Sequence, residues 1–173
     1  MITEIKNKVT VNGNPLTLAG NELKVGDKAP NFVLMNNNMK EVTLEHYAGK
    51  VLVIATLPSL DTPTCDMEVK RFNNEAIKMS DDIQILAISM DLPFAQKRWC
   101  ANAGVDRVHT LSDYKTGQFS IDYGLLIEEM QLSARAVFIL DKNHNINYIQ
   151  FVSDISKEPD YEEVLRALKE VAQ

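Results

Sequence analysis

Short apolar stretches alternate along the chain with segments in which apolar residues recur at helical spacing. Residues 50 to 57 are β-branched and apolar at successive positions, which predicts a strand buried between helices on both faces. Strands at 83 to 89 and 108 to 111 are predicted to alternate with helices at 93 to 103 and 116 to 123. An amphipathic helix is predicted after the first strand from the stripe Cys65, Val69, Phe72, Ala76 and Met79. Such alternation is typical of an α/β sheet.

The two ends of the chain predict antiparallel elements. Residues 9 to 18 alternate apolar and polar positions around Asn12-Gly13, a dipeptide that tolerates positive φ, which predicts an N-terminal β-hairpin. Near the other end, the apolar runs 134 to 140 and 146 to 151 flank a polar turn and predict a second hairpin. The spacing of apolar residues over 161 to 171 then predicts a terminal amphipathic helix.

Length and charge narrow the class of protein. The chain has 173 residues, of which 45% are apolar, and no linker rich in Gly, Pro or Ser divides it. We therefore expect a single domain over residues 1 to 173. The 18 basic and 24 acidic residues give a net charge of −6 without a basic block, so neither a nucleic-acid partner nor an anionic membrane surface is expected. No secretion signal or membrane-spanning run is visible, and a cytoplasmic location is expected.

Two cysteines and three histidines are the first candidates for reactive or metal-binding residues. Cys65 and Cys100 are too few for a disulfide-stapled scaffold and too far apart for a C-x-x-C motif. His46, His109 and His144 lack the close spacing to cysteine that is typical of zinc sites, so no metal is expected.

The segment that ends at Cys65 predicts a reactive thiol. Thr62 followed by Pro63 is typical of a helix N-cap and first helical position, which puts Cys65 in the first turn. Unpaired amides and the helix dipole favour a thiolate there. Full ionisation gains only roughly 30-fold, so an efficient enzyme also needs a fixed cation beside the reacting atoms. Arg135 interrupts an apolar run, and its guanidinium needs an anion such as this thiolate.

The run Pro58-Ser59-Leu60-Asp61-Thr62-Pro63-Thr64-Cys65 contains the pattern Pro-x-x-x-Thr-x-x-Cys and resembles the active-site segment of peroxiredoxins, in particular the thiol peroxidase subgroup. The resemblance covers nearly the whole chain, including Arg98-Trp99-Cys100 and Ser133-Ala134-Arg135. It implies a thioredoxin-like fold with a central mixed sheet flanked by helices. It also implies a peroxidase that reduces hydrogen peroxide and organic hydroperoxides in antioxidant defence, without metal, flavin or haem.

The residue roles come from this resemblance. Cys65 is implied to be the peroxidatic cysteine, Thr62 and Arg135 to orient the peroxide and activate the thiolate, Pro58 to shield the pocket, and Cys100 to be the resolving cysteine. The Cys65 sulfenic acid would condense with Cys100, thioredoxin would reduce the disulfide, and the chain would form a homodimer. Because a disulfide needs Cα atoms within about 7 Å and the two cysteines lie on different predicted helices, we expect local unwinding around both.

Other interpretations of these residues stay open at this point. Cys65 and Cys100 lie on apolar helix faces and could be small core residues. Arg135 could form a structural ion pair with Asp122 or Glu129.

Two other functions also fit the sequence. A cysteine hydrolase or acyltransferase would need a histidine base, such as His46 or His109, close to Cys65. A non-catalytic thioredoxin-like module would use its redox state to regulate a partner. Thr62 could be no more than a helix cap, and Pro58 could simply end a strand.

Overall fold

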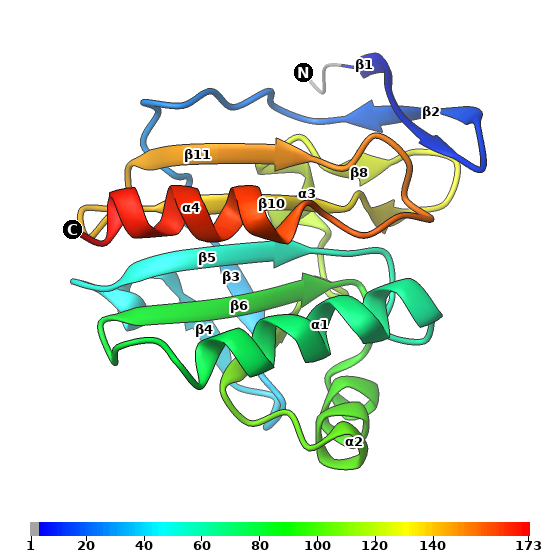
Figure 1. The fold of residues 1–173 in the computed structure, drawn as a ribbon. Helices are drawn as coiled ribbons and strands as arrows, with labels where there is room; N and C mark the ends of the chain where they lie inside the picture. The colour runs from blue at the N-terminus through cyan, green and yellow to red at the C-terminus, as the bar shows by residue number, and fades with distance from the viewer. Residues whose placement is uncertain (1–3) are drawn as a thin grey trace.

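The computed structural model describes residues 4–173, and a mixed sheet runs through its centre (Figure 1). Within these residues the sheet has seven strands in the order β11-β10-β5-β6-β7-β3-β4. In chain order they are β3 (Val33–Met35), β4 (Glu41–Thr43), β5 (Val51–Thr56), β6 (Ile83–Ser89), β7 (Val108–Ser112), β10 (Ala136–Leu140) and β11 (Ile146–Phe151). The strand β5 pairs in parallel with β6 and antiparallel with β10, so the predicted mixed α/β sheet is confirmed.

A smaller sheet contains the predicted N-terminal hairpin. Its strands follow the order β1-β2-β8-β9 and comprise β1 (Glu4–Val11), β2 (Asn14–Ala19), β8 (Leu126–Ile127) and β9 (Leu132–Ser133). The hairpin turns at Asn12 and Gly13, whose φ values of 49° and 83° explain the choice of this dipeptide. The two-residue strands β8 and β9 were not predicted, because segments so short carry no readable alternation.

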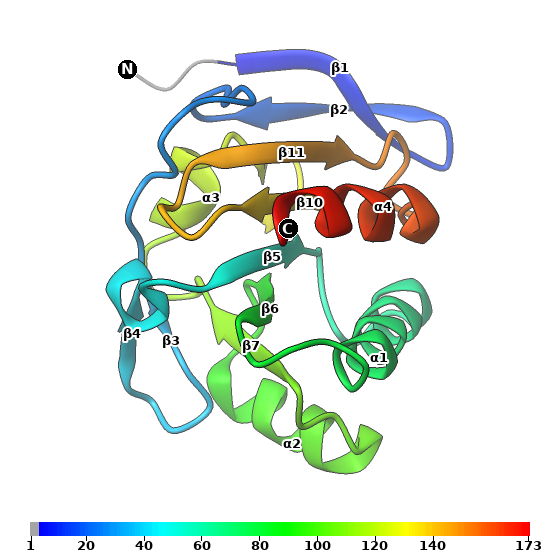
Figure 2. The ribbon, with the colours of Figure 1, turned by 60° about the vertical axis from the view of Figure 1, so that its left-hand side comes forward.

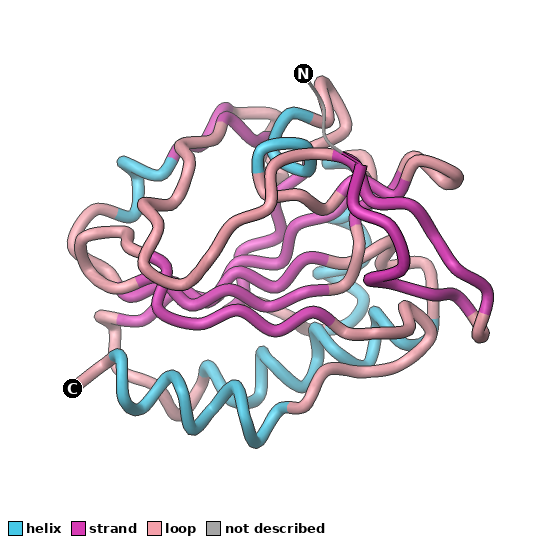
Figure 3. Tube along the Cα trace, turned by 90° about the horizontal axis from the view of Figure 1, so that it is seen from above, coloured by secondary structure: helices cyan, strands magenta, loops and turns pink. Residues whose placement is uncertain are grey.

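Helices cover the central sheet unequally. They are the 3₁₀ turn η1 (Leu44–Tyr47), α1 (Pro63–Ala76), α2 (Pro93–Ala103), α3 (Gln118–Asp122) and α4 (Tyr161–Val171). The helices α1 and α4 pack on one face, whereas α3 lies on the other (Figure 2). In the view from above, α1 and α4 lie side by side on one side of the strands (Figure 3). Within the described residues, no helix combines the length and apolar character that crossing a membrane requires.

Two apolar clusters form the core, one on each face of β5. Val53 and Ala55 pack against α1 and α4. Leu52 and Ile54 face the opposite way, toward the N-terminal hairpin, η1 and α3. The expectation that helices flank the sheet on both faces is confirmed, because α3 and η1 contribute to the core on the second face. The hairpin supplies much of the apolar cover there through Val9, Leu16 and Leu18.

The register of the sheet determines what lies at its edge. Thr56, the last residue of β5, pairs with Ala136 at the start of β10 and with Ile88 near the end of β6. The segment that follows β5 therefore lies beside the residue that precedes β10. That segment is the loop that leads to Cys65, and that residue is Arg135.

Candidate active site

Cys65 lies in the first turn of α1 and is fully buried, with 0% of its surface exposed. Thr62 is the N-cap, with extended φ and ψ of −112° and 147°, and Pro63 begins the helix, as predicted. The Thr62 side chain does not cap the helix, however. Its Oγ1 donates a hydrogen bond of 2.9 Å to the carbonyl of Ser59. Because the hydroxyl proton is used there, the Thr62 oxygen can only accept from a molecule that enters the site.

Arg135 points its guanidinium at this thiol. Its Nη2 lies 3.2 Å from the Sγ of Cys65, and only 1% of the arginine is exposed. The Nη2 and Nε atoms also donate to the carbonyl of Ile155, at 2.8 and 3.3 Å. Thr56 fixes the backbone on either side of the arginine, because its Oγ1 donates to the Ala134 carbonyl at 2.8 Å and accepts from the Ala136 amide at 3.1 Å. The structure thus brings together two residues separated by 70 positions that the sequence singled out independently.

Glu68 is the carboxylate that pairs with this arginine. Its Oε2 lies 2.5 Å from Nη1 of Arg135, and the glutamate is fully buried. The alternative partners Asp122 and Glu129 are engaged elsewhere, with Gln118 Nε2 and with the backbone amide of Thr17. Glu68 was not predicted from the sequence, although its position carries a readable signal. It lies three positions after Cys65, on the same side of the predicted helix.

Burial raises the pKa of Glu68 to about 7, although the charge and hydrogen bond of Arg135 act in the opposite direction. Its Oε1 is buried without a hydrogen-bond partner among the described residues. The guanidinium is therefore shared between one carboxylate and one sulfur, and the carboxylate gains and loses its proton near neutral pH. The net charge of the Arg135–Glu68 pair beside Cys65 therefore depends on whether Glu68 is protonated.

The N-terminal hairpin supports the carbonyl that anchors the guanidinium. Asp154 precedes Ile155 and accepts from the Thr10 hydroxyl at 2.7 Å and the Gly13 amide at 3.0 Å, both in the hairpin. Hydrogen bonds from Ser156, Gly13 and Thr10 hold the pKa of Asp154 well below its usual range. The hairpin is therefore tied to the loop that carries the Ile155 carbonyl.

The other two predicted site residues occupy different surroundings. Pro58 is buried in the loop between β5 and α1. Cys100 lies in α2 and is partly buried, and both cysteines are free thiols. The Cys100 Sγ lies 3.3 Å from the hydroxyl of Thr110 and 3.8 Å from Nδ2 of Asn37. These contacts anchor the sulfur away from Arg135, so the two thiols belong to separate polar environments.

A cavity of about 500 Å³ beside Cys100 also contains the two histidines that a hydrolase would need. His46 and His109 both line it, and His109 Nδ1 lies 3.2 Å from the hydroxyl of Tyr47. Within the described residues, the hydrogen-bond partner of Cys65 Sγ is the arginine and no histidine. A histidine-activated cysteine is therefore not supported by the geometry.

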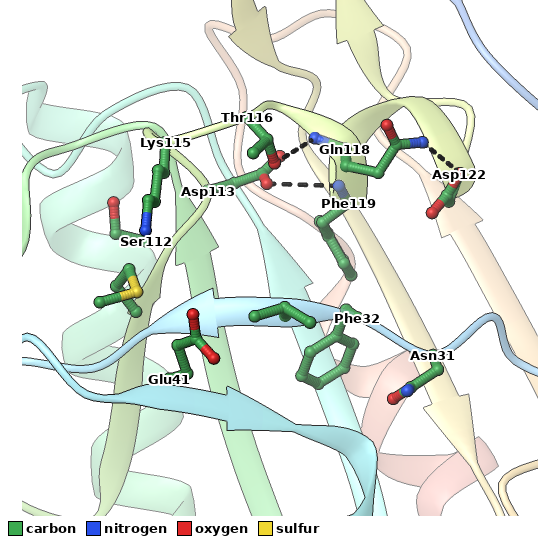
Figure 4. A pocket seen from close by; sticks show the side chains of 12 residues that line it. Asn31, Phe32, Glu41, Ser112, Asp113, Lys115, Thr116, Gln118, Phe119 and Asp122 are labelled. Atoms are coloured by element: carbon green, nitrogen blue, oxygen red, sulfur yellow. Dashed lines mark hydrogen bonds between the residues drawn. The ribbon is translucent and has the colours of Figure 1, made fainter.

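A second cavity, of about 390 Å³, opens between β3, β4 and the start of α3 (Figure 4). Phe32 and Phe119 form part of its apolar lining, and none of the five predicted site residues lines it. Asp113 at its edge accepts from the backbone amide of Phe119 at 3.2 Å. Burial raises the pKa of this aspartate. Among the described residues, no group of three or more His, Cys, Asp or Glu side chains is arranged to hold a metal ion.

Comparison with known proteins decides the family. A family model described as Redoxin matches residues 24–165. The chain belongs to the redoxin family. Proteins similar to it include a thiol peroxidase from Oceanobacillus iheyensis, 50% identical over 162 residues, covering 94% of this chain and 98% of that one. A thiol peroxidase from Halalkalibacterium halodurans is 48% identical over 161 residues, covering 93% and 96%.

A solved structure supports the same assignment. The crystal structure of a peroxiredoxin-like protein from Aquifex aeolicus superposes with a TM-score of 0.89 at 41% identity, covering 97% of this chain and 98% of that one. The thioredoxin-like fold and the similarity to the thiol peroxidases of the peroxiredoxin family, both predicted from the sequence, are confirmed.

Proposed function

We propose that this redoxin reduces hydroperoxides through attack by the Cys65 thiolate and that Cys100 resolves the product. As a thiol peroxidase, the chain reduces hydroperoxides in an antioxidant role. The observation that supports the assignment of the reacting atom is the 3.2 Å contact between Cys65 Sγ and the Arg135 guanidinium, inside the first turn of a helix. A positive helix end and a buried guanidinium both stabilise a thiolate and the anion that leaves it.

In the first step, the Cys65 sulfur attacks the nearer peroxide oxygen and the O–O bond breaks. The sulfur becomes a sulfenic acid, and the departing oxygen takes a proton and leaves as water or an alcohol. The Arg135 guanidinium stabilises the charge that develops on that oxygen. The Thr62 oxygen accepts a hydrogen bond from the peroxide O–H, and Pro58 shields the reacting atoms from bulk water.

In the second step, the Cys100 thiol condenses with the sulfenic acid, which releases water and leaves a disulfide. Cys100 lies in α2 with its sulfur held by Thr110 and Asn37, and Cys65 lies in α1. Because the Cα atoms of a disulfide lie within about 7 Å, the first turn of α1 and the segment around Cys100 unwind before the bond forms.

An external dithiol then restores the enzyme, because the chain has only two cysteines. We assign this role to thioredoxin, and the need for a reduced dithiol favours the cytoplasm as the compartment. We also propose a homodimer. The observation that supports it is the exposure of Leu92 and Phe94, at 51% and 67%, where α2 begins.

The test is hydrogen peroxide turnover coupled to thioredoxin and its reductase. Wild-type protein should turn over, and Cys65→Ser should be inactive. Cys100→Ser should react once and then stop. A sulfenate-specific reagent should label Cys65 in that variant. The assignment would be contradicted if an acyl substrate formed a thioester with Cys65. It would also be contradicted if the Cys65→Ser variant still turned over peroxide.

A further inference from the structure

Asp91 connects the loop between β5 and α1, which leads to Cys65, to the helix that carries Cys100. It lies between β6 and α2. One carboxylate oxygen accepts from the Ser59 hydroxyl at 2.6 Å, and the other accepts from the Leu60 amide at 2.8 Å, both in the loop before α1. The second oxygen also accepts from the Ser89 hydroxyl at 2.7 Å. A single carboxylate thus receives three hydrogen bonds from two segments.

These hydrogen bonds continue on both sides. In the loop, the Ser59 carbonyl accepts from the Thr62 hydroxyl at 2.9 Å. On the other side, the Ser89 hydroxyl accepts at 3.1 Å from Nε2 of Gln96, a buried side chain of α2 one turn before Cys100. A continuous set of hydrogen bonds therefore joins a side chain of the proposed peroxide pocket to the helix of the resolving cysteine.

A second link lies one residue away from each cysteine. Trp99 Nε1 donates to Asp66 Oδ1 at 2.9 Å, which ties α2 to the first turn of α1. Asp66 follows Cys65 and Trp99 precedes Cys100. Trp99 is also the single tryptophan of the chain, so its fluorescence reports directly on this part of the molecule.

We propose that Asp91 is a positioning residue that makes the loop before α1 and the helix α2 open together, and that it thereby controls which product the sulfenic acid forms. This inference rests on the proposed function. Two reactions compete for the sulfenic acid. Condensation with the Cys100 thiol gives a disulfide and water. Attack by the sulfenate on a second hydroperoxide breaks its O–O bond and gives a sulfinic acid and an alcohol or water.

The direction of the effect follows from the geometry. With Asp91 in place, the closed arrangement of the loop and α2 is favoured. The peroxide pocket is then complete, and the Cys100 sulfur is held away from Cys65. Without the carboxylate, the loop and α2 separate more readily, and Cys100 reaches the sulfenic acid sooner. Because one charge-assisted hydrogen bond changes an equilibrium by roughly tenfold, Asp91→Ala should lower the sulfinate formed per turnover by roughly that factor. The first attack on peroxide should slow, because Thr62 loses the support of Ser59.

The experiment measures how the sulfenic acid partitions. Wild type and variants turn over graded hydrogen peroxide with thioredoxin recycling, and intact mass gives the fraction of chains that retain two added oxygen atoms. Asp91→Ala is the main variant, and Asp91→Asn, which keeps one acceptor oxygen, should fall between it and wild type. Ser59→Ala removes a single hydroxyl and keeps the test valid if Asp91→Ala does not fold. Asp61→Asn is the matched control, because it removes a carboxylate from the same loop.

Trp99 fluorescence of the reduced proteins provides the second readout. Lower sulfinate formation and a shift of the tryptophan spectrum toward a more exposed environment, in the Asp91 and Ser59 variants but not in Asp61→Asn, support the proposal. Equal or greater sulfinate formation in the folded Asp91 and Ser59 variants overturns it. Absence of a Cys65–Cys100 disulfide in wild type would instead overturn the proposed function, so the two failures are distinguishable.

Discussion

Replacement of Glu68 by glutamine tests the electrostatics of the site. The carboxylate is fully buried and its Oε2 lies 2.5 Å from Nη1 of Arg135. Glutamine has nearly the same shape, and its Oε1 can still accept a hydrogen bond from the guanidinium. The substitution therefore removes a titratable charge while it leaves the packing and one hydrogen bond in place. Glu75→Gln, on the same helix, is the matched control because Glu75 is partly exposed and pairs with Arg71.

The magnitude follows from the pKa. Burial raises the pKa of Glu68 from 4.5 to about 7, so the native state binds this proton more tightly than the unfolded chain does. At about 1.4 kcal/mol for each pKa unit, about 3 kcal/mol of folding free energy depends on pH through this residue. That stability is fully present below pH 4.5 and is lost as the pH rises through about 7. In Glu68→Gln this residue no longer titrates, so the pH-dependent loss of stability disappears.

The assay is urea unfolding of wild type and Glu68→Gln at about pH 5 and about pH 8, with the free energy of unfolding extrapolated to water. Between these pH values the wild type should lose about 2 to 3 kcal/mol more than the variant does. Contributions from Asp113, whose pKa burial raises, and from His109, whose pKa burial lowers, cancel in this comparison. The same pH dependence in both proteins would refute the reasoning, as would a Glu75→Gln profile that matches Glu68→Gln.

Three further substitutions test the remaining parts of the site. Arg135→Ala leaves a cavity and removes the hydrogen-bond partner of Glu68 and of the Ile155 carbonyl, so it should destabilise the fold by about 3 to 5 kcal/mol in urea unfolding and slow peroxide attack by at least about 100-fold in stopped flow. A near-wild-type rate would remove this arginine from the site. Thr62→Val keeps the backbone geometry of the N-cap, so the Tm should change little while the attack rate falls by about 100-fold; a large loss of Tm with an unchanged rate would indicate a structural role. Cys100→Ser should accumulate Cys65 sulfinic acid in excess peroxide, as measured by intact mass, and continued recycling by thioredoxin would contradict a resolving role.

Periodicity was sufficient to predict the main elements of the fold. The run that forms β5 and the stripe that forms α1 are each long enough to reveal their period. The stripe reaches Met79, three residues beyond the end of α1, because the chain still packs against the core after the helix ends. The packing of the hairpin on the second face of β5 was not predicted, because the apolar residues of a hairpin do not reveal which surface they will meet.

The candidate site was predictable where one residue carried two signals. Cys65 follows the N-cap pair Thr62-Pro63, which places its thiol at a helix N-terminus. Arg135 is a charged residue within an apolar strand. Each residue was therefore unusual by itself. Their contact depends on the register of β5 with β10, which only the fold supplies. Glu68 and Asp91 were missed because acidic residues near a helix start are ordinary on a surface. Their importance comes from burial and from partners distant in sequence.

The most direct test of the central claim is the intact mass of the fully reduced protein before and after one equivalent of hydrogen peroxide. We expect the loss of two hydrogen atoms and, after proteolysis, a single linked peptide pair that contains Cys65 and Cys100. An unchanged mass, or oxidation located on any residue other than these two, would contradict the account.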